Sequence, residues 1–150
     1  MDKYMNVALD EVKEYLNKGL GGPFGACIID STGKIIAVAH NEVIKKNDPT
    51  AHAEIEAIRM ASQALNNYNL KGCTLYTTCM PCPMCLSAII WANINKVYYG
   101  CTSLDADNLG FKDAKIYDYI NGKNKDILEL NSLDHDECLE IFNKYNNKIY

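Results

Sequence analysis

Short apolar runs alternate with segments of helical periodicity over the first hundred residues, and this alternation constrains the fold more than any other feature of the chain. Apolar side chains at helical spacing predict a helix over residues 4–18, and Gly19, Gly21 and Gly22 end it. Strands are expected over residues 24–29, 34–39, 74–77 and 96–99, and further helices over residues 52–65 and 82–92. The last two strands are joined through one helix, so we expect them to be parallel, in a mixed sheet with helices on both faces.

The last third of the chain has weaker patterns. Residues 102–113 are interpreted as a polar loop, 114–121 as a short helix, 127–130 as a fifth strand and 134–144 as a helix. Together with the earlier elements, they predict an α/β fold: a three-layer α/β/α sandwich around a mixed five-stranded sheet. A chain of 150 residues fits a single domain, so we expect residues 1–150 to form one unit.

Composition restricts the cellular setting and the partners. Hydrophobic residues make up 48% of the chain, enough for one core, and no run of them approaches the roughly 20 residues that a membrane span needs. The first residues are charged throughout and lack the apolar stretch of a secretory signal, so we expect a cytoplasmic protein without membrane contact. The net charge of −4 disfavours nucleic acid as the main partner. Seven cysteines in a cytoplasmic chain favour free thiols or metal ligands over disulfides.

Two short segments contain side chains that bind metal ions. Residues 50–54 have the sequence TAHAE, and residues 80–85 have the sequence MPCPMC. Each lies at an expected helix start that follows a proline, and together they offer His52, Cys82 and Cys85 as ligands. One imidazole and two thiolates suit Zn²⁺, and three protein ligands leave the fourth tetrahedral position open to water. The sequence therefore predicts one Zn²⁺ per chain, with a catalytic water.

The spacing of the two cysteines supports metal binding. Cys82 and Cys85 are three residues apart, so both point from one face of the predicted helix. The N-terminus of a helix lowers the pKa of a thiol through its dipole and free N–H groups, which favours the thiolate that zinc requires. Zinc in turn lowers the pKa of a bound water to around 7, so that hydroxide is available at neutral pH.

Glu54 follows His52 by two residues and cannot point the same way from a helix, so it need not be a ligand. It can lie beside the water and act as general base and then as general acid. The pairing of His-x-Glu with Pro-Cys-x-x-Cys is the sequence pattern of zinc-dependent nucleobase deaminases, so we predict hydrolytic deamination. Two alternatives stay open: Cys79 as a fourth ligand would close the site and make it structural, and a Cys-x-x-Cys pair alone is also typical of redox sites.

The chain resembles the cytidine deaminase-like superfamily, and within it most closely the small bacterial guanine deaminases. The matching stretches are GGPFG at residues 21–25, NDPTAHAE at residues 47–54 and PCPMC at residues 81–85. The run GFKD at residues 110–113, the pair Ile116 and Tyr117 after it, and Trp91 are more particular to the guanine deaminase branch. The resemblance covers most of the chain, from residue 21 to about residue 120.

This resemblance implies a substrate and a set of residues that contact it. The reaction would convert guanine to xanthine and ammonia. Asn41 matches the asparagine that hydrogen-bonds the purine ring, and Phe24 and Trp91 match aromatic side chains that line the pocket. Asp113 matches an aspartate that relays a proton to the leaving amine. Ala53, between the histidine ligand and the proton carrier, is placed in the substrate-binding set as well.

The resemblance also implies a homodimer in which the C-terminal segment swaps across subunits, so that Tyr150 caps the site of its neighbour. Two positions depart from the family pattern. Met80 stands where the family usually has a glutamate; since that glutamate is not a zinc ligand, we expect metal binding to be unchanged and the polarity of the pocket to differ. A late proton-relay glutamate of the family aligns with Asn131, and Glu129 lies nearby.

Other activities were compared with this prediction. A tRNA adenosine deaminase shares the sequence of residues 48–54 but usually carries a basic C-terminal helix, whereas residues 126–140 here contain six acidic residues and no lysine or arginine. A cytosine or nucleoside deaminase is a further alternative. The non-enzymatic alternative is an inactive zinc-binding scaffold, and the presence of Glu54 argues against it.

Overall fold

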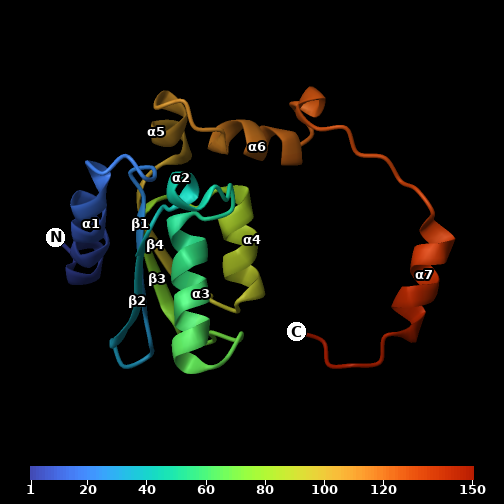
Figure 1. The fold of residues 1–150 in the computed structure, drawn as a ribbon, viewed down its shortest axis with the longest axis horizontal. Coiled ribbons are helices and arrows are strands. Elements are labelled where there is room, and N and C mark those ends of the chain that lie inside the picture. Colours follow the sequence, from blue (N-terminus) through green and yellow to red (C-terminus); the bar gives the residue numbers. More distant parts are fainter.

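A computed structural model describes residues 1–150, and Figure 1 shows the order of its elements. The helices are α1 (Lys3–Leu16), α2 (Val43–Lys46), α3 (Ala53–Leu65), α4 (Pro83–Trp91), α5 (Ser103–Asn108), α6 (Asp113–Ile120), the short 3₁₀ helix η1 (Lys125–Ile127) and α7 (His135–Lys144). The strands are β1 (Gly25–Ile29), β2 (Ile35–His40), β3 (Thr74–Cys79) and β4 (Val97–Cys101). No helix is both long enough and apolar enough to cross a membrane.

The four strands form one mixed sheet in the order β2-β1-β3-β4. Strand β1 is antiparallel to both of its neighbours, and β3 and β4 are parallel, as expected from the helix that connects them. Helix α1 covers one face of the sheet, and α3 and α4 cover the other (Figure 1). The predicted three-layer α/β/α sandwich is therefore confirmed.

The predicted fifth strand at residues 127–130 is wrong, and the sheet has four strands. Ile127 ends η1, and the residues that follow make no ladder with the sheet. Figure 1 shows this stretch running away from β4 toward α7. The apolar side chains of Leu128 and Leu130, which suggested a strand, are exposed in the chain. An apolar segment forms a strand only where a neighbouring strand can bond its backbone N–H and C=O groups, and this segment has no such neighbour.

The core lies between the sheet and α3. Ala53, Ala57 and Ala61 recur every four residues along one face of α3 and are completely buried. They pack in one cluster with Ile28 of β1 and Leu75 of β3, which are also completely buried. Because alanine has a small side chain, this face lets α3 pack close to the sheet. This packing fixes the position of the first turn of α3 relative to the sheet.

Two further predictions needed correction in the loops. The expected polar loop at 102–113 contains α5, which begins with a capping box between Thr102 and Asp105: each accepts a bond from the other's backbone N–H. The sequence NDPT at residues 47–50 predicts Asp48 or Thr50 as the cap of α3, but His52 holds the cap position. Asp48 accepts bonds from the backbone N–H and the hydroxyl of Thr50 and so shapes the preceding turn.

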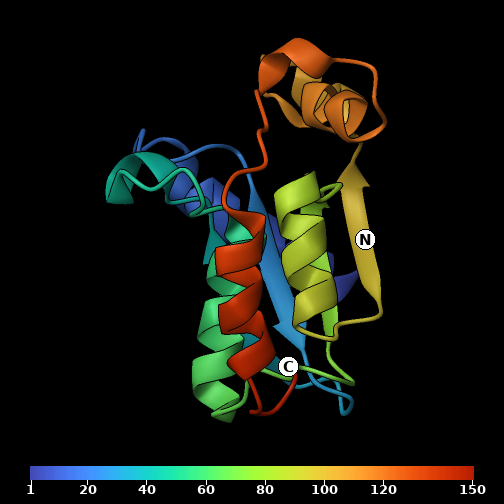
Figure 2. The ribbon, with the colours of Figure 1, turned by 90° about the vertical axis from the view of Figure 1, so that its right-hand side faces the viewer.

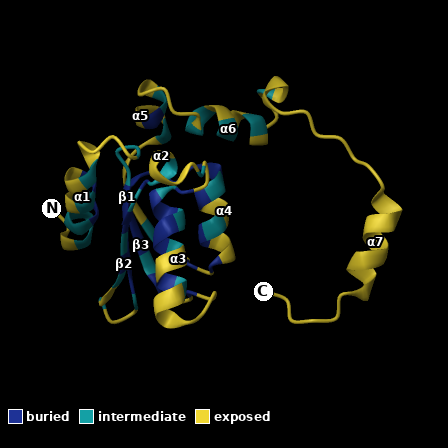
Figure 3. Ribbon diagram, in the orientation of Figure 1, coloured by how far each residue is buried: buried dark blue, intermediate teal, exposed yellow.

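The C-terminal segment, residues 128–150, stands apart from the rest of the molecule. Figure 1 shows α7 separated from α3 and α4, at the end of a long connection from α6, and in the view of Figure 2 α7 stands in front of these two helices. Every residue of α7 is exposed, including Ile141 and Phe142, and Figure 3 shows the whole helix in the colour of exposed residues. At its end the chain returns to α4, where the ring of Tyr150 lies 5.9 Å from that of Trp91.

Candidate metal centre and active site

The N-terminal ends of two helices meet at one edge of the sheet. His52 is the cap residue of α3 and Cys82 is the cap residue of α4, while Cys85 lies in the first turn of α4. Helices α3 and α4 pack side by side, and α4 begins beside α6 (Figure 1). Since Pro83 occupies the first turn of α4, its missing N–H costs no helical hydrogen bond.

The three predicted ligands converge. The imidazole Nδ1 of His52 lies 3.6 Å from the sulfur of Cys82 and 3.5 Å from the sulfur of Cys85. All three donor atoms lie within 4.8 Å of one another, and the two cysteines are buried. One imidazole nitrogen and two sulfurs within this distance fit a tetrahedral Zn²⁺. The structure therefore supports the predicted zinc ion, one per chain.

A closed site with four protein ligands is excluded by the donor set. Cys79 does not belong to the cluster, because its sulfur lies 3.5 Å from the backbone carbonyl of Thr102. Burial raises the pKa of the Cys79 thiol to about 12, so it stays protonated. Glu54 is also outside the cluster. Three protein ligands are the number that catalytic zinc sites have, with one position left for water or substrate.

The electrostatics of the cluster favour the thiolate of Cys82, whereas the hydrogen bond to Cys82 and burial raise the pKa of the Cys85 thiol. A hydrogen bond from Cys85, together with the contact with His52, lowers the pKa of Cys82 well below its ordinary value despite its burial. The thiolate of Cys82 is therefore available at neutral pH. In turn, the hydrogen bond with Cys82 raises the pKa of His52. Binding of zinc is coupled to the loss of the protons that His52 and Cys85 hold, because zinc binds neutral imidazole and thiolate.

Glu54 is placed to carry a proton beside this cluster. Its side chain is buried, and one carboxylate oxygen, Oε2, lies 3.5 Å from the sulfur of Cys85. The other, Oε1, lies 3.2 Å from the hydroxyl of Thr77, which also bonds the carbonyl of Cys79 at 3.1 Å. Burial raises the pKa of Glu54, which brings its carboxyl closer to the range in which it both accepts and returns a proton.

A cavity of about 480 Å³ opens onto the cluster. Fifteen residues line it: Gly21, Gly22, Pro23, Phe24, Asn41, Val43, Ile44, Pro49, His52, Glu54, Cys79, Met80, Cys82, Phe111 and Asp113. The lining contains no lysine or arginine, the side chains that most often pair with a phosphate group. Polar groups that can act on a ligand are few and are set among apolar side chains, as in small-molecule sites.

Asn41 presents one end of its amide to the cavity. Its Oδ1 accepts hydrogen bonds from the backbone N–H groups of Gly22 at 3.2 Å and Val43 at 3.1 Å. The oxygen is therefore occupied by the protein, and the NH₂ group is the part that is free for a ligand. The aromatic wall is made by Phe24 and Phe111, whose rings meet edge to face at 4.9 Å.

Asp113, the first residue of α6, also lines the cavity. Burial and the neighbouring negative charge of Cys82 raise its pKa, while His52 lowers it. Helix α6 is tied to the ligand loop by Tyr117, whose hydroxyl donates a 2.6 Å bond to the carbonyl of Pro81. This bond fixes the distance between the carboxyl of Asp113 and the first ligand of α4.

The other predicted substrate contacts do not lie in the cavity of their own chain. The methyl group of Ala53 is completely buried in the core, so only its backbone is available for a contact. Trp91 is 65% exposed at the far end of α4, where it packs with Tyr150. Glu129 is exposed and accepts a bond from Asn131 at 3.0 Å. Neither Trp91 nor Tyr150 therefore lines the cavity at the three ligands of its own chain.

Three side chains near the site received no role from the sequence. Thr77 lies within a buried strand, and its position beside Glu54 follows from the packing of α3 against β3. Phe111 and Tyr117 belong to stretches that mark the guanine deaminase branch, but nothing in the pattern predicts their contacts with Phe24 and Pro81. For these two residues the sequence contained a family motif, but the motif did not indicate which side chains or backbone groups they contact.

The chain is similar in sequence and fold to known zinc-dependent deaminases. A family model described as the cytidine and deoxycytidylate deaminase zinc-binding region matches residues 1–101. Guanine deaminase of Bacillus subtilis is 48% identical over 120 residues, which are 80% of this chain and 76% of that protein. Its X-ray structure superposes with a TM-score of 0.84 and 39% identity, covering 100% of this chain and 99% of that chain. A solved tRNA:A34 deaminase has a TM-score of 0.63 and 41% identity, covering 66% of this chain and 75% of that chain.

The fold, the three-ligand centre and the buried carboxyl beside it define a zinc-dependent nucleobase deaminase. The chain belongs to the family of cytidine and deoxycytidylate deaminases that share this zinc-binding region.

Proposed function

We propose that the enzyme hydrolyses guanine to xanthine and ammonia. The observation that carries this proposal is the extent of the likeness: the solved guanine deaminase matches the whole chain, including α6 and the C-terminal segment, whereas the solved tRNA:A34 deaminase covers 66% of it. The cavity agrees with a free base, because its lining has aromatic and apolar side chains and no cationic group for a phosphate.

His52, Cys82 and Cys85 hold the zinc ion, which, when bound, activates a water molecule for attack on the amino-bearing carbon. Glu54 takes a proton from the attacking water and returns it to the ring. Its two oxygens have different neighbours, so one stays fixed by Thr77 while the other remains on the side of the ligands. Because Thr77 is completely buried, this arrangement holds the carboxyl in a single orientation.

Asn41 recognises the base through the NH₂ group of its amide, because the two backbone N–H groups already occupy the oxygen. The free donor selects a ring with an acceptor at that position. Phe24, supported by Phe111, provides a flat face against which a planar heterocycle stacks. Both interactions fix the ring relative to Glu54, and this positioning converts a bimolecular step into one within the complex.

Asp113 delivers a proton to the departing amine. It lines the same cavity as Glu54 but comes from a different element, α6, so the two carboxyl groups approach the base from different directions. Amine loss requires protonation of nitrogen, and the raised pKa of Asp113 supports a carboxyl that holds a proton until then.

The active unit of this proposal is a homodimer. Trp91 and Tyr150 of one chain form an aromatic pair, with ring centroids 5.9 Å apart, that is remote from the cavity of that chain. Both residues can line the active-site cavity only if that cavity belongs to the second chain. The exposed apolar side chains of α7 and the tail, including Ile141, Phe142 and Ile149, support burial against a partner. In this assembly Tyr150 closes the neighbour's cavity, and the C-terminal segment is swapped.

A cytoplasmic setting completes the proposal. All seven cysteines are free thiols, including the two metal ligands, and a reducing compartment keeps them so.

The test is a substrate panel scored by ammonia release: guanine, guanosine, adenine, cytosine, cytidine and a tRNA anticodon stem-loop. We expect guanine to be deaminated, and guanosine and the stem-loop to be inert. A chain that acts on the stem-loop alone would refute the proposal and favour the tRNA adenosine deaminases. Zinc content, measured on the same sample, separates the absence of metal from a wrong choice of substrate.

A further inference from the structure

The connection between β2 and α3 forms one wall of the cavity. It contributes five of the lining residues: Asn41, Val43, Ile44, Pro49 and His52. The short helix α2 lies in the middle of this connection. The position of α2 relative to α3 therefore decides how far the base-binding amide of Asn41 stands from the carboxyl of Glu54.

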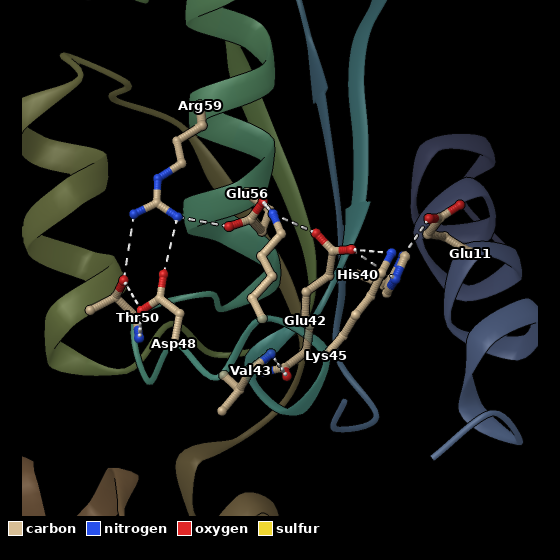
Figure 4. A network of polar contacts seen from close by, with 11 residues as sticks. Glu11, His40, Glu42, Val43, Lys45, Asp48, Thr50, Glu56 and Arg59 are labelled. Carbon is tan, nitrogen blue, oxygen red and sulfur yellow. Dashed lines mark hydrogen bonds and ion pairs between the residues drawn. The ribbon is translucent and has the colours of Figure 1, made fainter. Parts of the chain in front are cut away.

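On the outer side of this wall, one ammonium group joins two nearly buried carboxylates. Lys46, the last residue of α2, bonds Oε2 of Glu42 at 2.8 Å and also donates to Oε2 of Glu56 in the first turn of α3. The side chains of Glu42 and Glu56 are only 14% and 10% exposed. Figure 4 shows both carboxylates in one network that runs between α3 and the end of β2. Lys46 is thus a bridge from α2 to α3.

The network continues at both ends of this bridge. Arg59 donates to Oε1 of Glu56 at 2.7 Å and lies 3.8 Å from Asp48, which shapes the turn before His52. At the other end, His40 lies 3.8 Å from Glu42 and 2.7 Å from Glu11 of α1 (Figure 4). Apart from His52, none of these residues lines the cavity. They enclose the wall from outside without touching a ligand.

Such a network is an inefficient way to gain stability. The two carboxylates lose much of their hydration here, whereas the Lys46 side chain stays 42% exposed, and the attraction repays the loss only in part. The ionic contact adds direction, because one ammonium bonded to two carboxylates on different elements fixes the distance between those elements.

The partner of Lys46 on α3 lies close in the chain to the catalytic carboxyl. Glu56 lies two residues after Glu54 on the same helix, and its backbone N–H donates to the carbonyl of His52 at 2.9 Å. We propose that Lys46 and Glu56 are positioning residues that hold the α2 wall against the zinc-binding helix and thereby set the affinity for the base, an inference that rests on the proposed guanine deamination. Neither residue touches the substrate, so the effect on binding exceeds the effect on the chemical step.

Kinetics of two matched lysine variants test this proposal. Lys46→Met removes the ammonium and keeps the length of the side chain, and we expect KM for guanine to rise about tenfold while kcat stays within about threefold. Lys45→Met is the control, because Lys45 belongs to the same helix, is half exposed and bonds only Glu42. Lys46→Arg should restore most of the affinity. An unchanged KM in Lys46→Met, or a kcat that falls alone, would overturn the proposal.

Hydrogen exchange gives a readout that does not depend on activity. In Lys46→Met and Glu56→Gln, the amides of residues 42–48 should exchange faster than in the wild type, while the zinc content stays at one per chain. In Lys45→Met these amides should keep their protection. Equal exchange in all four proteins would refute the bridge even if guanine proved not to be the substrate. If the wild type did not deaminate guanine but the two variants still exchanged faster than the wild type, the result would refute the proposed function alone.

Discussion

The hydroxyl of Tyr117 in α6 donates a 2.6 Å hydrogen bond to the backbone carbonyl of Pro81, the residue that precedes the first cysteine ligand. Through this bond, the helix that carries Asp113 and the loop that carries Cys82 have a defined separation. Replacing Tyr117 with phenylalanine removes the bond and leaves the ring. We expect kcat/KM for guanine to fall by up to about tenfold, since a lost hydrogen bond costs roughly 0.5–1.5 kcal/mol. Steady-state kinetics with Tyr119→Phe as control, whose hydroxyl lies 3.5 Å from its acceptor at an exposed position, check this.

Glu54→Gln should separate metal binding from proton transfer. The amide has nearly the same shape but cannot accept the proton of the attacking water, so turnover should fall by a factor of about 10² or more. Because Glu54 is outside the donor cluster, the zinc content should remain one per chain. Atomic absorption and ammonia release from the same preparation measure both properties. Glu14→Gln on the exposed side of α1 is the control, and turnover retained in Glu54→Gln would remove Glu54 from the mechanism.

Asn41→Asp tests the direction of the amide. The substitution keeps the oxygen that accepts from Gly22 and Val43, and it exchanges the NH₂ donor for a second oxygen. The base would then lose a donor and meet a negative charge, so KM for guanine should rise about 10–100-fold. Asn67→Asp is a matched control, since Asn67 also accepts a backbone N–H through Oδ1 but lies in an exposed turn. Equal KM values in the wild type and Asn41→Asp would show that the donor does not bind the base.

Mixed dimers test whether Tyr150 acts on its own site or on that of the neighbour. Glu54→Gln and Tyr150→Ala should each have low activity as homodimers. In a swapped dimer, one site of each mixed dimer combines the Glu54 of one chain with the Tyr150 of the other. Refolding the two together should therefore recover about a quarter of wild-type activity, because half of the dimers are mixed and each has one complete site. The pair Tyr150→Ala with the double variant Glu54→Gln/Tyr150→Ala is the control, and the absence of recovery in the first mixture would contradict the swap.

Glu42 should make stability depend on pH in the acid range. The hydrogen bond from Lys46, with help from Lys45, lowers the pKa of Glu42 to about 2 in the folded chain, below its ordinary value of 4.5. The unfolded chain therefore takes up this proton first as the pH falls, so the contribution to stability is complete above about pH 4.5 and is lost between about 4.5 and 2. Glu42→Gln should unfold at a lower temperature than the wild type at pH 7. The difference in Tm should disappear near pH 2, and a constant difference across this range would contradict the assignment.

The order of the elements was predictable because each of them depends on local pattern. Helical spacing from Met5 to Leu16 and the apolar runs of the four strands were sufficient to predict the sandwich and the parallel pair β3–β4. The stretch 127–130 had an equally apolar pattern and formed no strand. Its failure is physical: a strand is stabilised by the backbone of a neighbour, and whether a neighbour is available does not depend on the stretch itself.

The sequence by itself determined the chemistry of the site, because the identities and spacing of His52, Glu54, Cys82 and Cys85 select zinc and place each residue at a helix start. Tertiary structure alone decided which side chains surround that chemistry. Thr77 reaches Glu54 through the packing of α3 against β3, and Lys46 reaches Glu56 through the packing of α2 against α3. Trp91 and Tyr150 are directed away from the cavity of their own chain. Such contacts join residues that are far apart in sequence or on different elements. They depend on how the layers pack against each other, and the local sequence pattern does not determine that packing.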